Sequence, residues 1–358
     1  MDDHISLDHG SGGKKMHELI RRVFIQHLGN PWLEAMGDAA VLEMKEGRVS
    51  FTTDSYVVDP LFFPGGDIGK LAICGTVNDL AVTGALPRFI SAGFILEEGL
   101  PVDVLGSVVR SMAETASRAG VQIVTGDTKV VNRGKCDKLF INTAGLGILS
   151  EKYAHIASAG LVKVGDHIII SGHIGDHGMA ILSQRKDFPM KTGLKSDCAP
   201  LNGLIATILE RSGRVPERSD RVPEQSGRVP EQSGRVRFMR DPTRGGVATT
   251  LCELVEGRPF GVHIREPDLP LRDEVLGMCE MFGFDPLYVP NEGKVLLVVD
   301  PAVSRDVLEV MHHHPEGKHA AIIGEITGSD RGRVILETAT GGSRIVHMLT
   351  GEQLPRIC

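Results

Sequence analysis

Residues 70–82 read KLAICGTVNDLAV, and the rest of the fold can be predicted outward from them. Apolar residues occur at nearly every position, which predicts a helix over 68–83 that is buried on all sides. Asp79 is unusual in such a helix, because a carboxylate is costly to bury without a partner. A bound metal ion would remove that cost. The segment therefore predicts a buried helix that carries part of a metal site.

The flanking sequence alternates between strands and helices and predicts two units. The first, an α+β unit that closes near residue 150, has strands at 49–54, 121–127 and 139–149 and a second helix at 103–119. The second begins with a strand at 166–172 and continues with helices at 247–256 and 303–313 and strands at 294–300, 320–326 and 333–338. The fold class is therefore α+β or α/β, and periodicity does not give the order of the strands.

Two segments differ from this pattern. Residues 1–13 contain glycines around Ser11 and are predicted to be a flexible arm, followed by an amphipathic helix that carries Met16, Leu19, Ile20, Val23 and Leu28. Residues 211–236 repeat motifs such as SGRVPEQ, and a proline in each repeat excludes a continuous helix. We interpret the repeat as a polar surface loop, with a docking arm as the alternative. Deletion of 213–233 should leave folding and catalysis intact.

Composition and charge exclude several classes of partner. The chain has 358 residues, 41% hydrophobic and 24% charged, and its net charge is −7. Gly is frequent (43 residues), aromatic residues make up only 4% and no strong basic patch is evident, so no nucleic-acid partner is expected. The six cysteines form no CxxC pair, which favours reduced thiols. Without a recognisable signal peptide or membrane-spanning apolar run, we expect a cytoplasmic protein with no membrane partner.

Four aspartates indicate where a metal would bind. Asp54 ends a predicted strand, Asp127 lies in a Gly-Asp turn, Asp38 precedes the apolar AAV, and Asp79 lies in the buried helix. Oxygen-rich clusters at strand ends and turns suit Mg²⁺ that is bridged to phosphates. The alternative is that some of these carboxylates are helix caps or buried ion-pair partners.

Glycine-rich segments before helices are candidates for phosphate binding, because the first backbone amides of a helix are free to bind anions. GSGGKK (10–15) adds two lysines but is not a Walker A sequence. DPTRGG (241–246) directly precedes a helix, and the alternative there is an ordinary turn capped by Asp241. HIGDHG (173–178) is interpreted as a structural turn, and the three consecutive histidines at 312–314 as a solvated helix end.

The chain ends in LTGEQLPRIC (349–358), with a cysteine as the last residue. Pro355 disfavours a helix, so an extended tail is expected. Such a tail reaches ~27 Å from Thr350, and its thiolate, a nucleophile, can then move between an interior pocket and a partner's site. For the tail taken alone, the alternative is a frayed terminus that happens to end in cysteine.

Together, these motifs resemble the HypE family of hydrogenase maturation factors, the carbamoyl dehydratases of the aminoimidazole-ribonucleotide-synthetase (PurM-like) superfamily. The acidic and glycine motifs are common to the superfamily, whereas the PRIC ending is specific to this family. The resemblance covers nearly the whole chain apart from the repeat. It is carried by HGSGGK (9–14), GDAAV (37–41), TTDSYVVDP (52–60), GTVNDLAVTGA (75–85), TGDTKVV (125–131), GDHG (175–178), MRDPTRGG (239–246), VPNEG (289–293) and PRIC (355–358).

The resemblance implies a PurM-like two-domain fold. Residues 1–36 would form the glycine-rich arm and its helix, and 37–152 an N-terminal α+β domain that binds ATP and pairs its strands in a homodimer. Residues 153–345 would form a C-terminal α/β domain with the repeat insert at 211–236. Residues 346–358 would be a mobile tail ending in Cys358.

The resemblance also implies the activity. In the family, a carbamoyltransferase, HypF, carbamoylates the terminal cysteine, ATP-dependent dehydration gives a thiocyanate, and the cyano group passes to iron on a HypC–HypD complex for the [NiFe]-hydrogenase centre. By motif, Asp38, Asp54, Asp79 and Asp241 would bind Mg²⁺. Cys358 would carry the substrate, with Glu292 as base and Lys129 as its electrostatic partner. The ATP and phosphate site would comprise Gly10, Ser11, Gly12, Gly13, Lys14, Asn78, Asp127, Gly245 and Gly246.

Two other functions remain as alternatives. One is another ATP-using member of the superfamily, such as selenophosphate synthetase. That enzyme is expected to carry a cysteine or selenocysteine in its N-terminal glycine-rich segment, and LDHGSGGKK has neither. The other is a non-catalytic docking module, which needs no Mg²⁺–ATP site. Asp54, Asp79 and Asp241 therefore speak against it.

Overall fold

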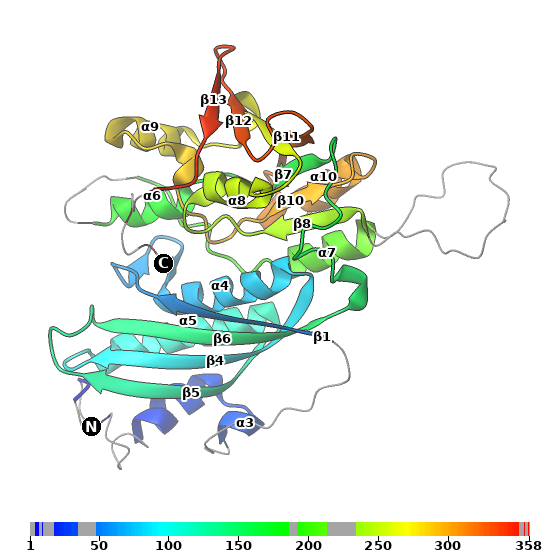
Figure 1. Cartoon of the computed structure of the whole chain (residues 1–358). Coiled ribbons are helices and arrows are strands. Elements are labelled where there is room, and N and C mark those ends of the chain that lie inside the picture. The colour runs from blue at the N-terminus through cyan, green and yellow to red at the C-terminus, as the bar shows by residue number, and fades with distance from the viewer. Residues whose placement is uncertain are drawn as a thin grey trace.

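The computed structural model describes residues 4–6, 9, 18–34, 48–185, 192–212, 234–350, 354 and 357. These form two units, each built around its own large sheet (Figure 1). Several predicted features lie outside the described residues: the repeat segment 213–233 and the candidate site residues Gly10, Ser11, Gly12, Gly13, Lys14, Asp38 and Cys358.

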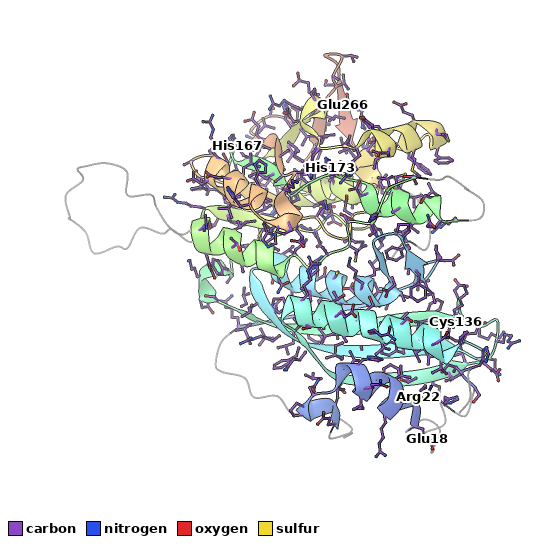
Figure 2. All side chains as sticks on the ribbon, turned by 180° about the vertical axis from the view of Figure 1, so that it is seen from behind. Glu18, Arg22, Cys136, His167, His173 and Glu266 are labelled. Atoms are coloured by element: carbon purple, nitrogen blue, oxygen red, sulfur yellow. The ribbon has the colours of Figure 1, made fainter. Side chains whose placement is uncertain are left out.

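The N-terminal unit is a four-stranded sheet covered on one face by two helices. The strand order is β1(Arg48–Tyr56), β6(Leu139–Leu149), β4(Ala85–Glu97) and β5(Gln122–Val131). Neighbouring strands are antiparallel except β4 and β5, which are parallel and are connected by helix α5(Val102–Ala119). Figure 1 shows the sheet in front of α4(Ile68–Val82) and α5, and Figure 2 shows the helices in front of it.

Helix α4 is the buried helix predicted from its composition. It begins at the N-cap Asp67, whose Oδ1 accepts hydrogen bonds from the amides of Gly69 (2.7 Å) and Lys70 (3.2 Å). Nearly every side chain along it is buried, because it lies between the sheet and the C-terminal unit (Figure 1). The prediction for 68–83 is thus confirmed, and any functional group on α4 lies in the interior.

No helix among the described residues covers the opposite face of this sheet, called the uncovered face below, and one end of it is apolar (Figure 1). Along β1, Ser50, Thr52, Asp54 and Tyr56 are turned towards α4, and the residues between them face outward. The outward face presents Phe51, 70% exposed, together with Val49 and Leu86 at 49% each. Val49 and Leu86 both pair with Ile148 of β6, so they lie in one row across the sheet. An apolar face of this kind marks a surface for association.

The C-terminal unit contains a seven-stranded sheet in the order β13-β12-β9-β11-β7-β10-β8. All neighbours are antiparallel except β12 and β9. The strands are β7(His167–Ile170), β8(Val236–Arg240), β9(Gly261–Arg265), β10(Leu296–Val299), β11(Ala321–Thr327), β12(Val334–Glu337) and β13(Ser343–Val346). The helices are α6(Asp176–Ser183), α7(Asn202–Ser212), α8(Gly246–Val255), α9(Asp273–Phe282) and α10(Ser304–His312).

Shorter elements complete the described chain. A π-helical turn η2(Ile20–Ile25) continues into α2(Gln26–Leu28) and is followed by α3(Pro31–Glu34), in agreement with the amphipathic helix predicted there. The strands β2(Phe62–Phe63) and β3(Gly66–Asp67) form a small hairpin before α4. The 3₁₀ turns are η3(Glu151–Tyr153), η5(Glu266–Asp268), η6(Pro286–Tyr288) and η7(Pro315–Gly317).

One apolar core joins the two units. Leu71 and Ile73 of α4 belong to the same cluster of buried side chains as Met179 of α6 and Val275 of α9. Two buried residues of the tail, Leu354 and Ile357, belong to it as well. The two sheets are therefore held together by direct packing, and the end of the chain is part of that packing.

The predicted elements are largely confirmed, including α5, β6, α8 and α10, whereas β4, β8, β9, β13, α7 and α9 were not predicted. No described helix combines the length and apolar character that are needed to cross a bilayer. The five cysteines that the structure describes are free, as predicted. Cys136 lies in the loop after β5 at the far end of the sheet (Figure 2), and burial raises the pKa of its thiol to about 11.

Candidate active site

Three of the predicted metal aspartates come from three different elements and act on one another. Asp79 lies on α4, Asp54 on the adjacent strand β1, and Asp241 directly after β8 of the other unit. The Thr52 hydroxyl donates a hydrogen bond to Asp79 Oδ2 (2.8 Å), and the Tyr56 hydroxyl donates to Asp54 Oδ2 (3.2 Å). The period of two along β1 turns Thr52, Asp54 and Tyr56 to the same face, towards α4.

This arrangement concentrates negative charge. Burial and then the charge of Asp54 raise the pKa of Asp79 to about 6. Burial and then the charges of Asp79 and Asp54 raise the pKa of Asp241 to about 7. Asp241 Oδ2 is buried and has no hydrogen-bond partner among the described residues. Three mutually repelling carboxylates with an unsatisfied oxygen form a site that a cation would stabilise.

The donor set fits Mg²⁺ held jointly with phosphates. Among the described residues, no three His, Cys, Asp or Glu side chains are close enough to enclose a metal ion by themselves. Mg²⁺ does not need such a cage, because it keeps several waters and is usually held by one or two carboxylates plus substrate phosphates. Asp54, Asp79 and Asp241 suit this open form of coordination.

Glu292 lies beside the acidic cluster. It is 3% exposed, and burial together with the neighbouring Cys198, Asp241, Asp197 and Asp54 raises the pKa of its carboxyl well above the usual range. Its backbone is held on both sides: its amide donates to Asp197 Oδ1 (3.1 Å), and its carbonyl accepts from Asn78 Nδ2 (3.3 Å). Glu292 is therefore a buried, rigidly placed carboxyl whose proton affinity is high.

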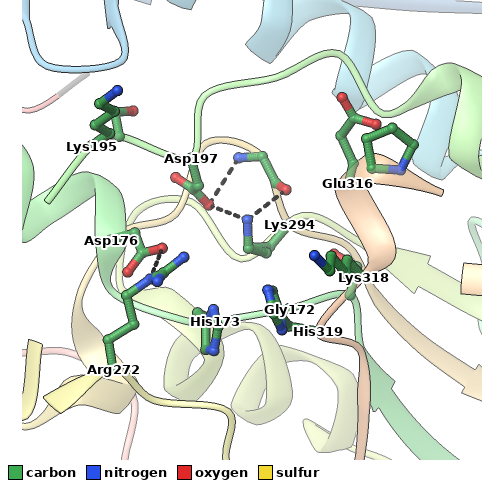
Figure 3. A pocket seen from close by; sticks show the side chains of 14 residues that line it. Gly172, His173, Asp176, Lys195, Asp197, Arg272, Lys294, Glu316, Lys318 and His319 are labelled. Atoms are coloured by element: carbon green, nitrogen blue, oxygen red, sulfur yellow. Dashed lines mark hydrogen bonds and ion pairs between the residues drawn. The ribbon is translucent and has the colours of Figure 1, made fainter. Parts of the chain in front are cut away.

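The loop of Glu292 also forms one wall of a pocket of about 270 Å³ in the C-terminal unit (Figure 3). Lys294 Nζ lies 3.0 Å from Asp197 Oδ2, and Arg272 Nε lies 3.0 Å from Asp176 Oδ2. Although burial acts against it, the Lys294 ammonium lowers the pKa of Asp197 below its usual range. Asp197 is thus held ionised and can bind the amides of Glu292 and Gly293. The ion pair between Lys294 and Asp197 in this pocket therefore helps to hold the Glu292 loop in place.

The end of the chain is docked in the same region. Leu354 and Ile357 are buried, at 8% and 3% exposure. His177 Nε2 lies 3.0 Å from the carbonyl oxygen of Ile357, and His177 Nδ1 lies 2.8 Å from Ser196 Oγ. Ser196 directly precedes Asp197, which binds the Glu292 backbone. The residue before Cys358 is therefore connected to the Glu292 loop through the side chains of His177, Ser196 and Asp197 and the peptide link between Ser196 and Asp197.

Comparison with known proteins identifies the family. Residues 36–149 match the family model "AIR synthase related protein, N-terminal domain", and residues 163–337 match the model of the C-terminal domain. The carbamoyl dehydratase HypE of Bradyrhizobium diazoefficiens is 45% identical over 354 residues, which cover 99% of this chain and 96% of the relative. The chain belongs to the HypE family.

Solved HypE structures agree with this membership. A crystal structure of the hydrogenase maturation protein HypE in complex with ATP matches with a TM-score of 0.87 and 45% identity, and the match covers 98% of this chain and 99% of that one. The structure of a HypE–HypF complex matches with a TM-score of 0.75 and 45% identity, over 92% and 99% of the two chains. The PurM-like two-domain fold predicted from the HypE resemblance is thereby confirmed.

Two residues predicted from HypE motifs lie elsewhere in the single chain. Asp127 and Lys129 are exposed on β5, the edge strand opposite β1. Asp127 is aligned with Gly93, Asn142 and Ser55 across the sheet, which is the uncovered face. The acidic cluster lies on the other face and three strand spacings away, about 14 Å. Within one chain, Asp127 and Lys129 therefore lie apart from the acidic cluster and Glu292, and their predicted roles stay predictions.

Asn78, which is predicted for the ATP and phosphate site, binds backbone groups of the C-terminal unit. It is 1% exposed, and its amide nitrogen donates to the carbonyls of Ala199 (3.1 Å) and Glu292 (3.3 Å), while its Oδ1 accepts from Leu201 N (2.8 Å). Both N–H donors are therefore used within the protein, and none is left for a phosphate. Asn78 positions the Glu292 loop against α4.

The glycines before α8 are explained in part by packing. Gly245 and Gly246 both have positive φ, at 77° and 59°, where other residues are strained. A Cβ on Gly246 would also lie within 2.8 Å of the Val289 carbonyl oxygen. The N-cap of α8 is Gly245, so the alternative that Asp241 caps this helix is not supported. The phosphate role of these glycines stays a prediction.

Several residues of the site were not predicted. His177, Ser196, Asp197 and Lys294 connect the tail, the Glu292 loop and the pocket. The signal for His177 was present in GDHG, whose strand–glycine–helix form had been interpreted as a turn. Asp197 and Lys294 become recognisable only once the fold has brought their separate segments together.

Proposed function

We propose that this chain is a carbamoyl dehydratase, which converts the S-carbamoyl group on its own Cys358 into a thiocyanate with ATP. The observation that supports this most strongly is the buried tail: Ile357, the residue before Cys358, is bound by His177 beside the Glu292 loop. The acidic cluster adds the second part of the proposed active site, because it can hold a metal ion that is bound to the phosphates of ATP. The 45% identity to a carbamoyl dehydratase, over 99% of the chain, supports the same activity.

The chemistry follows from the leaving group. An amide oxygen leaves poorly, so transfer of the γ-phosphoryl group of ATP to the carbamoyl oxygen gives an iminophosphate that can expel inorganic phosphate. The oxygen of the lost water therefore ends in phosphate, and both N–H protons must leave as C≡N forms. Mg²⁺ held by Asp54, Asp79 and Asp241, together with Asp38, would neutralise the phosphate charge.

Glu292 is the proposed acceptor for these protons. A buried carboxylate with a raised pKa is a stronger base than an exposed one, and general bases of this kind accelerate reactions by about 10²–10⁴-fold. Asn78 and Asp197 fix its backbone, which keeps the carboxyl in place. The buried position excludes water, which would otherwise compete as a nucleophile for the activated carbon.

The uncovered sheet face supports a homodimer. Phe51, Val49 and Leu86 would be buried against the same face of a second copy, as expected for an isologous interface. Asp127 and Lys129 lie on this face and would then meet the partner, where they remain candidates for the ATP site across the interface. We further propose that the protein acts in the cytoplasm, with HypF as carbamoyl donor and a HypC–HypD complex as acceptor of the cyano group.

Mass spectrometry of the C-terminal peptide tests this function. The chain is incubated with HypF, carbamoyl phosphate and ATP, and Cys358 should first gain a carbamoyl group and then lose one water only when Mg²⁺–ATP is present. Cys358→Ala should abolish both changes, and Cys136→Ala, a matched change of a half-buried cysteine, should affect neither. A carbamoylated peptide that keeps its water in Mg²⁺–ATP would contradict the proposal.

A further inference from the structure

His177 lies within GDHG (175–178) and contacts the tail at the carbonyl of Ile357. It is fully buried near the start of α6, and its ring stands edge-on to Phe63, with centroids 5.7 Å apart. Burial lowers the pKa of its imidazole, so the ring is neutral. A buried neutral histidine between two polar partners has a fixed hydrogen-bonding role.

Its two partners determine which nitrogen carries the proton. The Ile357 carbonyl can only accept, so Nε2 must be the protonated nitrogen and donate to it (3.0 Å). Nδ1 is then an acceptor, and the Ser196 hydroxyl donates a hydrogen bond to it (2.8 Å). Ser196 Oγ in turn accepts from the Cys198 amide (3.1 Å), and the Ser196 amide donates to Pro64 O (2.8 Å). The hydrogen bond from Ser196 thus orients the ring, and Nε2–H is the donor that the ring offers to the tail.

The next residue of the motif also contacts the tail. A Cβ placed on Gly178 would lie 2.5 Å from Val289 Cγ1, and 3.2 Å from both Leu354 Cδ1 and Pro290 Cδ. A side chain at this position would therefore clash with Val289 and also press on Leu354 of the tail. Two neighbouring residues of GDHG thus contribute to the binding of the tail. His177 donates a hydrogen bond to Ile357, and Gly178 has no side chain that would crowd Leu354.

We propose that His177 is a positioning residue that holds the C-terminal tail in the interior through the carbonyl of Ile357 and so presents Cys358 to the active site. His177 does not touch the reacting atoms; it acts through the backbone of the tail. The proposal rests on the proposed function only for its catalytic consequence, since docking of the tail can be measured without any reaction.

Two variants of His177 separate its two hydrogen bonds. His177→Gln places an amide nitrogen near the position of Nε2 and can still donate to Ile357. His177→Asn reaches only to the position of Nδ1, so it can contact Ser196 but not the tail. Ser196→Ala removes the group that orients the ring and provides a second route if either His177 variant folds poorly.

The docking test measures alkylation of Cys358 by iodoacetamide, followed on the C-terminal peptide in the absence of ATP. His177→Asn should raise the alkylation rate about fivefold over wild type, the population change expected for the loss of one hydrogen bond, and His177→Gln should stay near wild type. Ser196→Ala should lie between them. Equal alkylation rates in all four folded proteins would overturn the proposal.

The catalytic test follows single-turnover loss of water from carbamoylated Cys358. His177→Asn should slow this step while the affinity for Mg²⁺–ATP and the melting temperature stay close to wild type, and His177→Gln should restore the rate. Dehydration at the wild-type rate in His177→Asn would overturn the positioning role. If the wild-type protein itself does not dehydrate, the proposed function fails, and the alkylation result still decides the docking claim.

Discussion

Asp241, a proposed metal ligand, lowers the stability of the metal-free protein at neutral pH. Its Oδ2 is buried without a hydrogen-bond partner, and its pKa is raised to about 7 by burial and by Asp79 and Asp54. In the unfolded chain the pKa of an aspartate is about 3.9. Between these values the folded state binds more protons than the unfolded state, so this residue makes the metal-free protein less stable as the pH rises from about 4 to about 7.

Asp241→Asn should therefore stabilise the metal-free protein at pH 8, by on the order of 1 kcal/mol, and weaken binding of Mg²⁺–ATP. Urea unfolding without Mg²⁺ measures the first effect, and the stability difference between variant and wild type should be larger at pH 8 than at pH 5. Asp306→Asn, an exposed aspartate on α10, is the control and should show neither effect. An Asp241→Asn protein that binds Mg²⁺–ATP normally would remove Asp241 from the metal site.

Glu292→Gln separates proton transfer from binding. Glutamine keeps the shape of the side chain, and the backbone contacts of residue 292 with Asp197 and Asn78 do not involve the carboxyl group. Carbamoylation of Cys358 and Mg²⁺–ATP binding should persist, while the dehydration rate should fall by about 10²–10⁴-fold. Rapid-quench mass spectrometry of the C-terminal peptide measures the rate, and an unchanged rate would assign the base elsewhere.

Among the elements, α4 connects the fold to the site. One of its faces brings Asp79 to β1, and Asn78 beside it binds the backbone at Ala199, Leu201 and Glu292 of the other unit. Neighbouring residues of one helix therefore serve two different purposes. The apolar composition of α4 predicts its burial, but not which partner each polar residue meets.

Asn78→Ala leaves three buried backbone groups without their partner and should lower the free energy of unfolding by roughly 2–4 kcal/mol. Denaturant unfolding measures the loss, with the exposed Asn132→Ala as control. Because Asn78 has no donor left for a phosphate, the affinity of the folded variant for Mg²⁺–ATP should change little. Normal stability with loss of Mg²⁺–ATP binding would restore the phosphate role predicted from the motif.

The elements show where prediction from sequence ends. The helices α4 and α5 and the strand β6 were predicted because long apolar or periodic segments have few alternatives. Strand β4, ALPRFISAGFILE, was missed because Pro87 and Gly93 interrupt its alternation, and the pairing indeed shifts register between Pro87 and Phe89. The resemblance to a family supplied the two-domain architecture that periodicity could not.

Some residues of the candidate site could be predicted from the sequence and others could not. Asp54 and Asp79 could be proposed from sequence because carboxylates beside apolar segments need a partner, and Asp241 and Glu292 because of their motifs, and the structure places charged neighbours around Asp79 and Asp241. The place of Lys129 on the far edge strand could not be predicted, because a strand residue reveals neither its edge nor its neighbours in the sheet. His177 was overlooked because its partner, Ile357, is 180 residues away in sequence and is met only in the folded chain.

At the scale of the whole molecule, the uncovered sheet face predicts the assembly. Phe51→Glu places a charge at the most exposed apolar residue of that face and should convert a dimer to a monomer. Light scattering after size-exclusion chromatography measures the mass. Met281→Glu is the matched control: Met281 is 65% exposed on α9 of the other unit, so the variant should stay dimeric. A Phe51→Glu protein that remains dimeric would place the interface elsewhere.

Transfer of the carbamoyl oxygen to phosphate is the step on which the account depends. The direct measurement uses Cys358 carbamoylated with a heavy oxygen isotope, a single turnover with Mg²⁺–ATP, and mass analysis of the inorganic phosphate released. The account predicts one heavy oxygen in each phosphate for each thiocyanate formed. Thiocyanate formation with unlabelled phosphate, the isotope appearing in water instead, would contradict it.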